Sequence, residues 1–145
     1  MSDFDLDSFI PYQLAVIAAR TSRDFARHYR DQFDISIPEW RVVAHLAQSG
    51  KVSVREIHQR VDMDKSKVSR AAARLEAAGY VAKESGQHDR RLVELSLTPR
   101  GQALMDSLAP IARAYQDRFV QELGADAAGF GDTLKRLMQQ GTGAR

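Results

Sequence analysis

A group of positively charged and hydroxyl side chains between residues 65 and 74 is the strongest chemical signal in the sequence. Their spacing places four cations and two hydroxyls, without an acid, on one outward face of a helix. The group consists of Lys65, Ser66, Lys67, Ser69, Arg70 and Arg74. Lysine and arginine bind phosphate oxygens, and arginine also forms paired hydrogen bonds with guanine in the major groove. This face therefore predicts contact with DNA.

The opposite face of this segment is apolar, as expected for a helix that packs on a core. The residues that recur there at helical spacing are Val68, Ala71, Ala72, Leu75 and Ala78. Asp64 is placed to cap the first turn, and Gly79 is placed to end the helix in the left-handed conformation. We therefore expect a helix over residues 64–78.

A shorter helix should precede it. Ser53-Val54-Arg55-Glu56 is typical of a capping box, in which the Ser53 hydroxyl accepts from the Glu56 amide and the Glu56 carboxylate reaches back. This helix should run to about Val61, and Asp62-Met63-Asp64 then provides a tight turn before the cationic helix. Two short helices joined in this way form a helix-turn-helix. Ser53 is included among the expected DNA contacts.

A β-hairpin should follow the two helices. Residues 80–85 are predicted as one strand, and residues 92–97 alternate so that Val93, Leu95 and Leu97 face the core. The loop between the strands is polar and basic, and the negative potential of a minor groove attracts inserted arginines. The expected contacts at the tip are His88, Asp89, Arg90 and Arg91.

Six short motifs occur in an order and spacing that extend over nearly the whole chain. They are Ser36-Ile37-Pro38-Glu39-Trp40-Arg41, Asp64-Lys65-Ser66-Lys67-Val68-Ser69-Arg70, Arg74-Leu75-Glu76, Gly79-Tyr80-Val81, Asp89-Arg90-Arg91 and Leu95-Ser96-Leu97-Thr98-Pro99-Arg100-Gly101. In these motifs the chain resembles the MarR family of bacterial transcription regulators.

The resemblance implies a homodimer that binds a pseudopalindromic operator, usually as a repressor, and that a small aromatic or anionic effector often releases. It makes residues 64–78 the recognition helix, places Arg91 in the minor groove and gives Asp89 a part in holding the wing. We therefore expect a ligand-responsive repressor that binds double-stranded DNA. Two alternatives stay open: a winged-helix module that binds protein, and a nonspecific architectural DNA binder.

The expected fold is mainly α with a small antiparallel β-hairpin. It is a winged helix-turn-helix with flanking dimerisation helices, in a single MarR-like domain over residues 1–145. The DNA-binding lobe should span residues 35–97, and the helical dimerisation region should comprise residues 8–34 and 98–140.

Apolar stripes in the flanks predict helices that need a partner. One helix should run from Phe9 to Phe33. Another should begin at Thr98-Pro99, with a kink at Pro110, and Gly124 should separate it from a last helix. The stripe residues are Ile10, Leu14, Ile17, Ala18, Phe25, His28 and Tyr29 in the first helix and Phe130, Leu134, Leu137 and Met138 in the last. Exposed stripes favour a dimer, and folding back on the chain's own core is the alternative.

Composition agrees with one DNA-binding domain. The 145 residues are 43% hydrophobic with a net charge of +2, yet residues 51–91 hold ten lysines and arginines against six acids, a net charge of +4. The excess positive charge therefore lies on the segment that holds the predicted helix-turn-helix and hairpin. No apolar run is long enough to span a bilayer, no signal peptide is visible, and the chain has no cysteine. We expect a cytoplasmic protein without a thiol switch.

No group of residues in the sequence indicates catalysis. The four histidines His28, His45, His58 and His88 lack the short spacings of zinc ligands. The sequence has no glycine-rich phosphate loop and no nucleophile elbow. We therefore expect no enzymatic activity, no metal and no cofactor.

The resemblance also implies that an effector binds in a cleft between the flanking helices and the DNA-binding lobe. A set of aromatic and basic residues is a candidate lining for this cleft. The set is Tyr12, His28, Tyr29, Trp40, Arg41 and His45. An anion with an aromatic ring would suit such a lining. Core packing is an equally good interpretation for Trp40 and the tyrosines.

Overall fold

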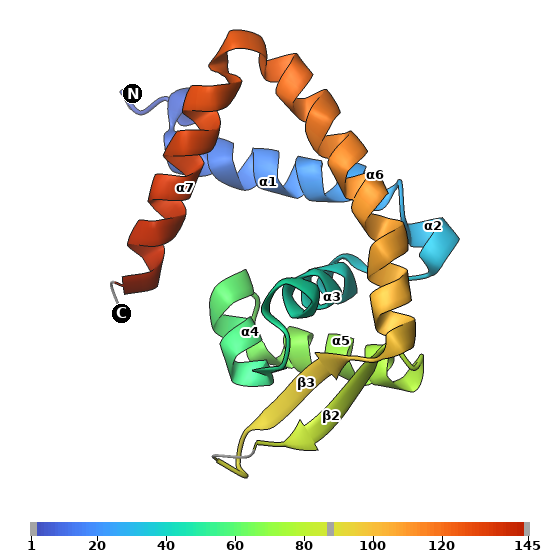
Figure 1. Cartoon of the computed structure of the whole chain (residues 1–145). Helices are drawn as coiled ribbons and strands as arrows, with labels where there is room; N and C mark the ends of the chain where they lie inside the picture. Colours follow the sequence, from blue (N-terminus) through green and yellow to red (C-terminus); the bar gives the residue numbers. More distant parts are fainter. Residues whose placement is uncertain (1–2, 87–88, 144–145) are drawn as a thin grey trace.

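The computed structural model describes residues 3–86 and 89–143, which form a helical frame around a small lobe (Figure 1). The elements are η1 (Leu6–Ser8), α1 (Ile10–Ala26), α2 (Arg30–Phe33), α3 (Ile37–Ser49), β1 (Val52–Ser53), α4 (Val54–Val61), α5 (Lys65–Ala77), β2 (Val81–Ser85), β3 (Val93–Leu97), α6 (Pro99–Leu123), η2 (Gly124–Asp126) and α7 (Ala127–Gly143). The fold class expected from the sequence is confirmed: the chain is mainly α with a small antiparallel sheet.

The N-terminal helix is shorter than expected, and the prediction of one helix from Phe9 to Phe33 is wrong. α1 ends at Ala26, and α2 begins at Arg30 after a turn. The break turns the Tyr29 side chain into the core, where it is fully buried and its ring lies 5.1 Å from that of Phe25. The apolar residues keep helical spacing through this turn, but the free energy gained by burying the Tyr29 ring exceeds that of continuing the helix.

The helix-turn-helix begins where its capping residues predict. The Ser53 hydroxyl accepts a hydrogen bond from the Glu56 amide (3.0 Å), and the Asp64 carboxylate accepts one from the Lys67 amide (2.9 Å). The capping box expected at Ser53 is only half formed, because the Glu56 carboxylate pairs with Arg60 at 3.5 Å instead. Asp62 takes the left-handed conformation in the turn, with φ 52°.

α5 ends in a Schellman motif, as the glycine after it suggested. Gly79 has φ 83°, and its amide donates to the Glu76 carbonyl at 3.0 Å. The Tyr80 amide donates to the Leu75 carbonyl at 2.9 Å. These two bonds satisfy carbonyls that would otherwise lack partners, so the chain leaves α5 in a fixed direction towards β2.

The three strands form an antiparallel sheet in the order β1-β3-β2, with Val81 opposite Leu97 and Ser85 opposite Val93. Leu95 is fully buried, as expected. Val93 was also expected to face the core, but it is 45% exposed. It lies at the start of β3, next to the loop, where the hairpin has already extended beyond the core.

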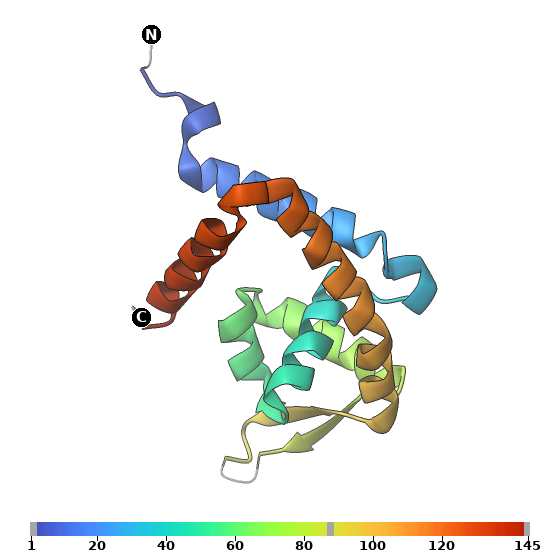
Figure 2. The ribbon, with the colours of Figure 1, turned by 45° about the horizontal axis from the view of Figure 1, so that its top comes forward.

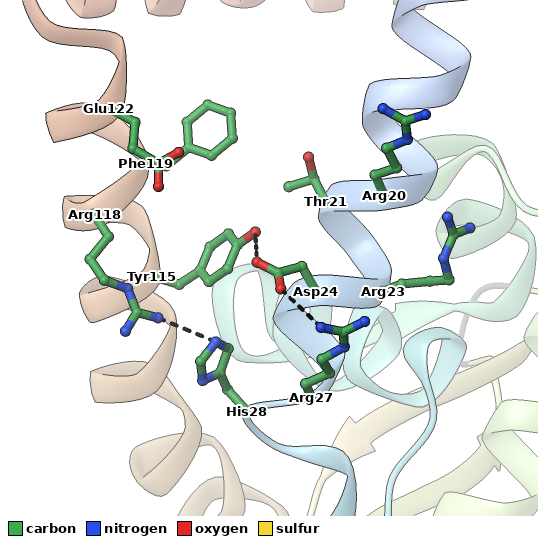
Figure 3. Close-up of a pocket in the computed structure, with 10 residues that line it drawn as sticks. All are labelled: Arg20, Thr21, Arg23, Asp24, Arg27, His28, Tyr115, Arg118, Phe119 and Glu122. Carbon is green, nitrogen blue, oxygen red and sulfur yellow. Dashed lines mark hydrogen bonds and ion pairs between the residues drawn. The ribbon is translucent and has the colours of Figure 1, made fainter.

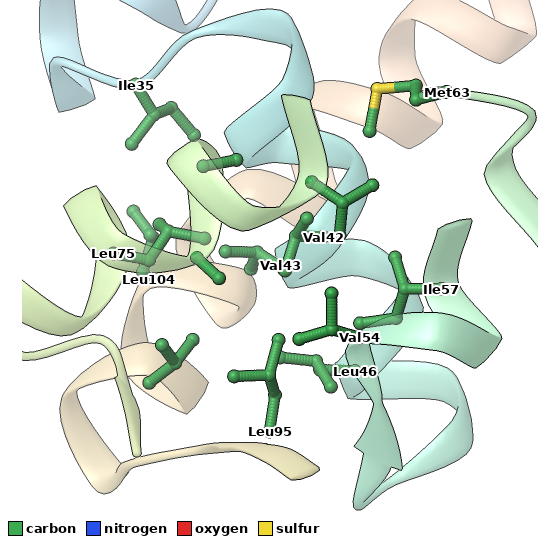
Figure 4. Close-up of a cluster of buried hydrophobic side chains, with 14 of the residues drawn as sticks. Ile35, Val42, Val43, Leu46, Val54, Ile57, Met63, Leu75, Leu95 and Leu104 are labelled. Carbon is green, nitrogen blue, oxygen red and sulfur yellow. The ribbon is translucent and has the colours of Figure 1, made fainter. Parts of the chain in front are cut away.

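The core joins α3, α4, α5, the sheet and the first turns of α6 (Figure 4). Val42, Leu46, Ile57, Leu95 and Leu108 are among its fully or almost fully buried side chains. Four of the five stripe residues of α5 are buried in it, namely Val68, Ala71, Ala72 and Leu75. The fifth, Ala78, is exposed at the C-cap. Because this face of α5 packs in the core, the opposite face, which carries the cationic and hydroxyl residues, points outward.

The flanking helices extend away from this lobe (Figures 1 and 2). α6 leads from the hairpin to the far end of the molecule, runs continuously through Pro110, and is followed by α7 after Gly124. α1 lies across α6, where the Phe25 and Tyr115 rings are 5.2 Å apart. None of the helices in the described ranges is long and apolar enough to cross a membrane.

Candidate nucleic-acid interface

The six cationic and hydroxyl residues singled out on α5 are all exposed, and they lie on the helix face opposite the core. The Ser66 hydroxyl donates to the Asp64 carboxylate at 2.9 Å. Hydrogen bonds from the Lys67 amide and the Ser66 hydroxyl lower the pKa of the Asp64 carboxyl. Asp64 therefore stays ionised and caps the end of α5 that carries Lys65.

The two arginines of this face differ in their contacts. Within the described ranges, Arg70 forms no hydrogen bond or ion pair, so its guanidinium is available to a ligand. Arg74 pairs with the Glu39 carboxylate at 3.8 Å, although its own side chain is 70% exposed. Their positions on the same helix face do not predict this difference.

One carboxylate holds the part of the hairpin loop that precedes β3. Asp89 accepts from the Arg91 amide at 3.0 Å and from the Arg91 guanidinium at 3.0 and 3.2 Å. The Arg91 side chain, followed by its amide, lowers the pKa of the Asp89 carboxyl. The Arg91 side chain is nevertheless 90% exposed, and Arg90 is exposed beside it. His88, also expected at the tip, lies outside the described residues.

A groove of about 660 Å³ lies between α4, α5 and the hairpin. Lys65 and Ser69 lie on its α5 side, and Asp89 and Arg91 on its hairpin side. Its lining also includes polar residues that sequence reasoning missed, namely Arg55, His58, Gln59 and Lys83. The spacing of Arg55, His58 and Gln59 on one face of α4 was the signal available for them. Ser53 lies at the N-cap of α4, with its hydroxyl engaged by the Glu56 amide.

The six residues expected to line an effector cleft are not gathered around one cavity. Tyr29 is buried, burial raises its pKa to about 12, and its ring lies 5.9 Å from that of Trp40. Arg41 donates to the Ser22 hydroxyl at 3.1 Å. His45 lies 3.4 Å from the Arg60 guanidinium on α4.

The remaining two of these six residues belong to α1 and the turn after it. Tyr12 is on the N-terminal half of α1 and is 41% exposed. His28 lines a cavity of about 510 Å³ between α1 and α6, together with residues that the sequence did not single out. The helices contribute to this cavity from positions some ninety residues apart, which no local pattern links.

The fold and the exposed face of α5 define a winged helix-turn-helix DNA-binding protein. Comparison with known proteins agrees, since the model of the MarR family matches residues 33–92. The regulator SarZ from Staphylococcus epidermidis is 22% identical over 116 residues, which is 78% of both chains.

Solved structures extend the similarity to the flanking helices. A MarR family regulator from Silicibacter pomeroyi has a TM-score of 0.81 and 28% identity, covering 94% of this chain and 98% of its own. A MarR/EmrR family regulator from Acinetobacter sp. ADP1 has a TM-score of 0.83 and 25% identity, over 94% and 97% of the two chains. Residues 33–92 match the MarR family, and the fold of the whole chain is similar to that of MarR family regulators. The comparisons therefore support a winged-helix DNA-binding regulator.

Proposed function

We propose that the protein is a transcriptional repressor that binds a pseudopalindromic operator as a homodimer. The observation that carries this proposal is the division of α5 into a buried apolar face and an exposed face of four cations and two hydroxyls. Such a helix fits the major groove, where its N-terminal residues meet base edges. Two-fold symmetry of the dimer then requires two related half-sites about 10 base pairs apart or a multiple of this spacing.

Within this face, Arg70 is the proposed base reader. Its guanidinium has no hydrogen bond or ion pair in the described ranges, and arginine is the side chain that binds guanine by two hydrogen bonds. Lys65 and Lys67 are proposed to bind phosphates, which fixes the position of the helix without reading sequence. Ser66 and Ser69 lie between these cations and complete the contact.

Arg91 is proposed to enter the minor groove beside the recognition helix. The Asp89 carboxylate holds the Arg91 guanidinium in one arrangement, while the Arg91 side chain stays exposed to a partner. A guanidinium is weakly hydrated and planar, so it enters a narrow groove at lower cost than an ammonium. Arg90 is proposed to reach the adjacent backbone.

The homodimer is proposed to form through the flanking helices. Large apolar side chains there are 39–69% exposed in the single chain: Ile10, Leu14 and Ile17 on α1, Val120 on α6, and Phe130, Leu134, Leu137 and Met138 on α7. Contiguous apolar stripes of this kind are stable in water when a partner covers them. A second copy presents the same stripes under two-fold symmetry.

A response to a small ligand is proposed from similarity to regulators whose structures describe one. BpsR from Bordetella bronchiseptica, 22% identical with a TM-score of 0.80, is described as regulated in DNA binding by 6-hydroxynicotinic acid. PcaV from Streptomyces coelicolor, 22% identical with a TM-score of 0.74, is described in complex with its natural ligand. The large cavity between α1 and α6 is compatible with such a response.

The test is a gel-shift titration of the region upstream of the protein's own gene, at several salt concentrations. A sequence-specific repressor should retard this duplex at lower concentration than a scrambled one, with affinity falling steeply as salt rises. Equal retardation of both duplexes would indicate a nonspecific architectural DNA binder. Absence of retardation at low salt would indicate a protein-binding module.

A further inference from the structure

The three histidines within the described ranges have different surroundings, and one of them lies on the candidate nucleic-acid interface. The His28 ring lies 3.3 Å from the Arg118 guanidinium at the cavity between α1 and α6 (Figure 3). His45 lies 3.4 Å from the Arg60 guanidinium. His58, on α4, lines the groove between α4, α5 and the hairpin. Histidine ordinarily changes its charge between about pH 5 and 8, so His58 is placed to make contacts in this groove depend on pH.

A hydrogen bond to the main chain holds the half-buried His58 ring. Its Nδ1 atom is bonded to the Met63 carbonyl oxygen, in the turn between α4 and α5. A carbonyl oxygen only accepts, so Nδ1 carries the proton of the neutral ring and Nε2 carries a lone pair. Within the described ranges, Nε2 forms no hydrogen bond and is not buried. One nitrogen therefore fixes the ring, and the other is free for a ligand.

The groove around His58 attracts anions. Its charged lining comes from α4, α5, β2 and the loop before β3, and consists of Arg55, Lys65, Lys83, Arg91 and one carboxylate, Asp89. These groups leave an excess of three positive charges. Arg55 and Lys65 form no hydrogen bond or ion pair within the described ranges. Because lysine and arginine bind phosphate oxygens, a DNA phosphate drawn into this groove would lie beside the His58 ring.

The protonation state of the ring decides whether it helps or hinders such a phosphate. In the neutral ring, the lone pair on Nε2 would face the phosphate oxygens, which are also acceptors. In the protonated ring, Nε2 donates a charge-assisted hydrogen bond instead. A negative charge beside a histidine favours its protonated form. Binding of a phosphate and binding of a proton at this ring therefore strengthen each other.

We propose that His58 is a proton-linked DNA contact. Its protonated Nε2 donates to a backbone phosphate held between α4, α5 and the hairpin, and each protomer takes up a proton from solvent on binding DNA. The affinity for DNA therefore rises as pH falls. Because the contact is to the backbone, it acts on any sequence. This inference rests on the proposed contact of α5 and the hairpin with DNA.

The test compares the full-length wild type with His58→Asn by fluorescence anisotropy on a labelled mixed-sequence duplex. The asparagine amide nitrogen lies near the position of Nδ1 and can still donate to the Met63 carbonyl, but nothing replaces Nε2. Between about pH 8 and 6, the Kd of the wild type should fall by a factor at least about three times larger than that of His58→Asn. The other histidines, His88 included, are present in both proteins, so this difference isolates His58. His28→Gln, outside the groove, should retain the wild-type pH dependence.

The salt dependence gives a second readout, which a purely structural role of His58 would not change. At about pH 6, one additional phosphate contact per protomer should make the plot of log K against log salt steeper by about 0.9 than at pH 8. His58→Asn should give the same slope at both pH values. Circular dichroism establishes folding, and His58→Gln, which keeps an amide near Nε2 without a charge, replaces His58→Asn if that variant is unfolded.

The outcomes separate this inference from the repressor proposal. Equal pH dependence of the wild type and the His58 variant, or no binding of DNA at either pH, would overturn the inference. Sequence-specific binding of the upstream region without proton linkage would overturn the inference and leave the repressor proposal intact. Proton-linked binding of every duplex without preference would support the inference and contradict the repressor proposal.

Discussion

The guanidinium of Arg74 lies 3.8 Å from the carboxylate of Glu39 and joins α5 to the start of α3. Glu39 is 7% exposed and is the one charged side chain buried within the described ranges. The same carboxylate accepts from the Ser36 amide at 3.3 Å and the Ser36 hydroxyl at 2.9 Å, closing a capping box. Arg74 thus positions α5, whereas Arg70 forms no hydrogen bond or ion pair within the described ranges.

This difference predicts that alanine substitutions of the two arginines affect different properties, operator binding for Arg70 and folding stability for Arg74. Arg70→Ala should cost about 1–3 kcal/mol of operator binding and relax preference at one position in each half-site. Arg74→Ala should lower the free energy of unfolding by about 0.5–1 kcal/mol, because most of the arginine is screened by solvent. Competition binding and urea unfolding measure the two effects. A loss of preference at one base with Arg74→Ala, without any loss of stability, would contradict this division.

The hairpin gives a second prediction. Arg91→Ala should weaken operator binding strongly and Arg91→Lys should restore only part of it, most visibly on A·T-rich flanks that narrow the groove. Asp89→Ala should weaken DNA binding while thermal stability stays nearly unchanged, because its bonds lie within the exposed loop. Anisotropy titrations on duplexes with exchanged flanks measure this. Equal affinity of Arg91→Ala and wild type on every flank would remove the hairpin from the mechanism.

A third prediction concerns the dimer. Leu134→Glu combined with Leu137→Glu places two charges in the exposed apolar stripe of α7 and should convert the dimer to a monomer. Arg136→Glu, on the other side of the same helix, is the control and should remain dimeric. Light scattering at micromolar concentration measures the mass. A monomeric wild type would contradict the proposed assembly.

A fourth prediction tests the junction between α5, the sheet and α6. A Cβ atom added to the buried Gly101 would lie 2.0 Å from the Tyr80 carbonyl oxygen, a distance that requires the backbone to move. Gly101→Ala should therefore lower the free energy of unfolding by about 1–3 kcal/mol or more. Gly129→Ala on α7 is the matched control, because its Cβ would meet nothing within 4 Å. That change should be neutral or stabilising. Comparable urea midpoints for both variants would refute the close approach.

A fifth prediction follows from His45. Burial, followed by the Arg60 guanidinium, lowers the pKa of His45. The unfolded chain then binds the proton on His45 more tightly than the folded protein does. The neutral His45 ring therefore makes its full contribution to the free energy of unfolding above the unfolded pKa of about 6.5, and this contribution falls as pH is lowered towards the pKa of the folded protein. As pH rises from about 5 to 7, the free energy of unfolding should therefore increase more for the wild type than for His45→Gln. Parallel pH profiles in urea unfolding would contradict this.

Local chemistry made much of the fold predictable. The capping side chains of Ser53, Asp64 and Thr98, and the left-handed Gly79, mark boundaries within one or two residues of those observed. The end of α1 was not predictable in this way, because Tyr29 continues the helical period although its burial requires a turn. Periodicity reports which face is apolar, and tertiary packing decides where a helix stops.

Contacts between distant segments were the part that the sequence could not supply. Glu39 and Arg74 meet only because α3 packs on α5, so two arginines of one face looked equivalent. Asp24 and Tyr115 are 91 residues apart, and no spacing rule links them. The cavity that they border was consequently missed, and the effector residues suggested instead are spread over the core and the surface.

Selection of genomic fragments bound by the purified protein tests the central claim most directly. The account predicts that the recovered fragments share a pseudopalindrome with half-sites spaced by whole turns of the duplex, about 10 base pairs each. Selection with Arg70→Ala should recover the same spacing with preference relaxed at one symmetric pair of positions. Recovery of fragments without a shared motif, or an unchanged motif with Arg70→Ala, would contradict sequence reading by α5.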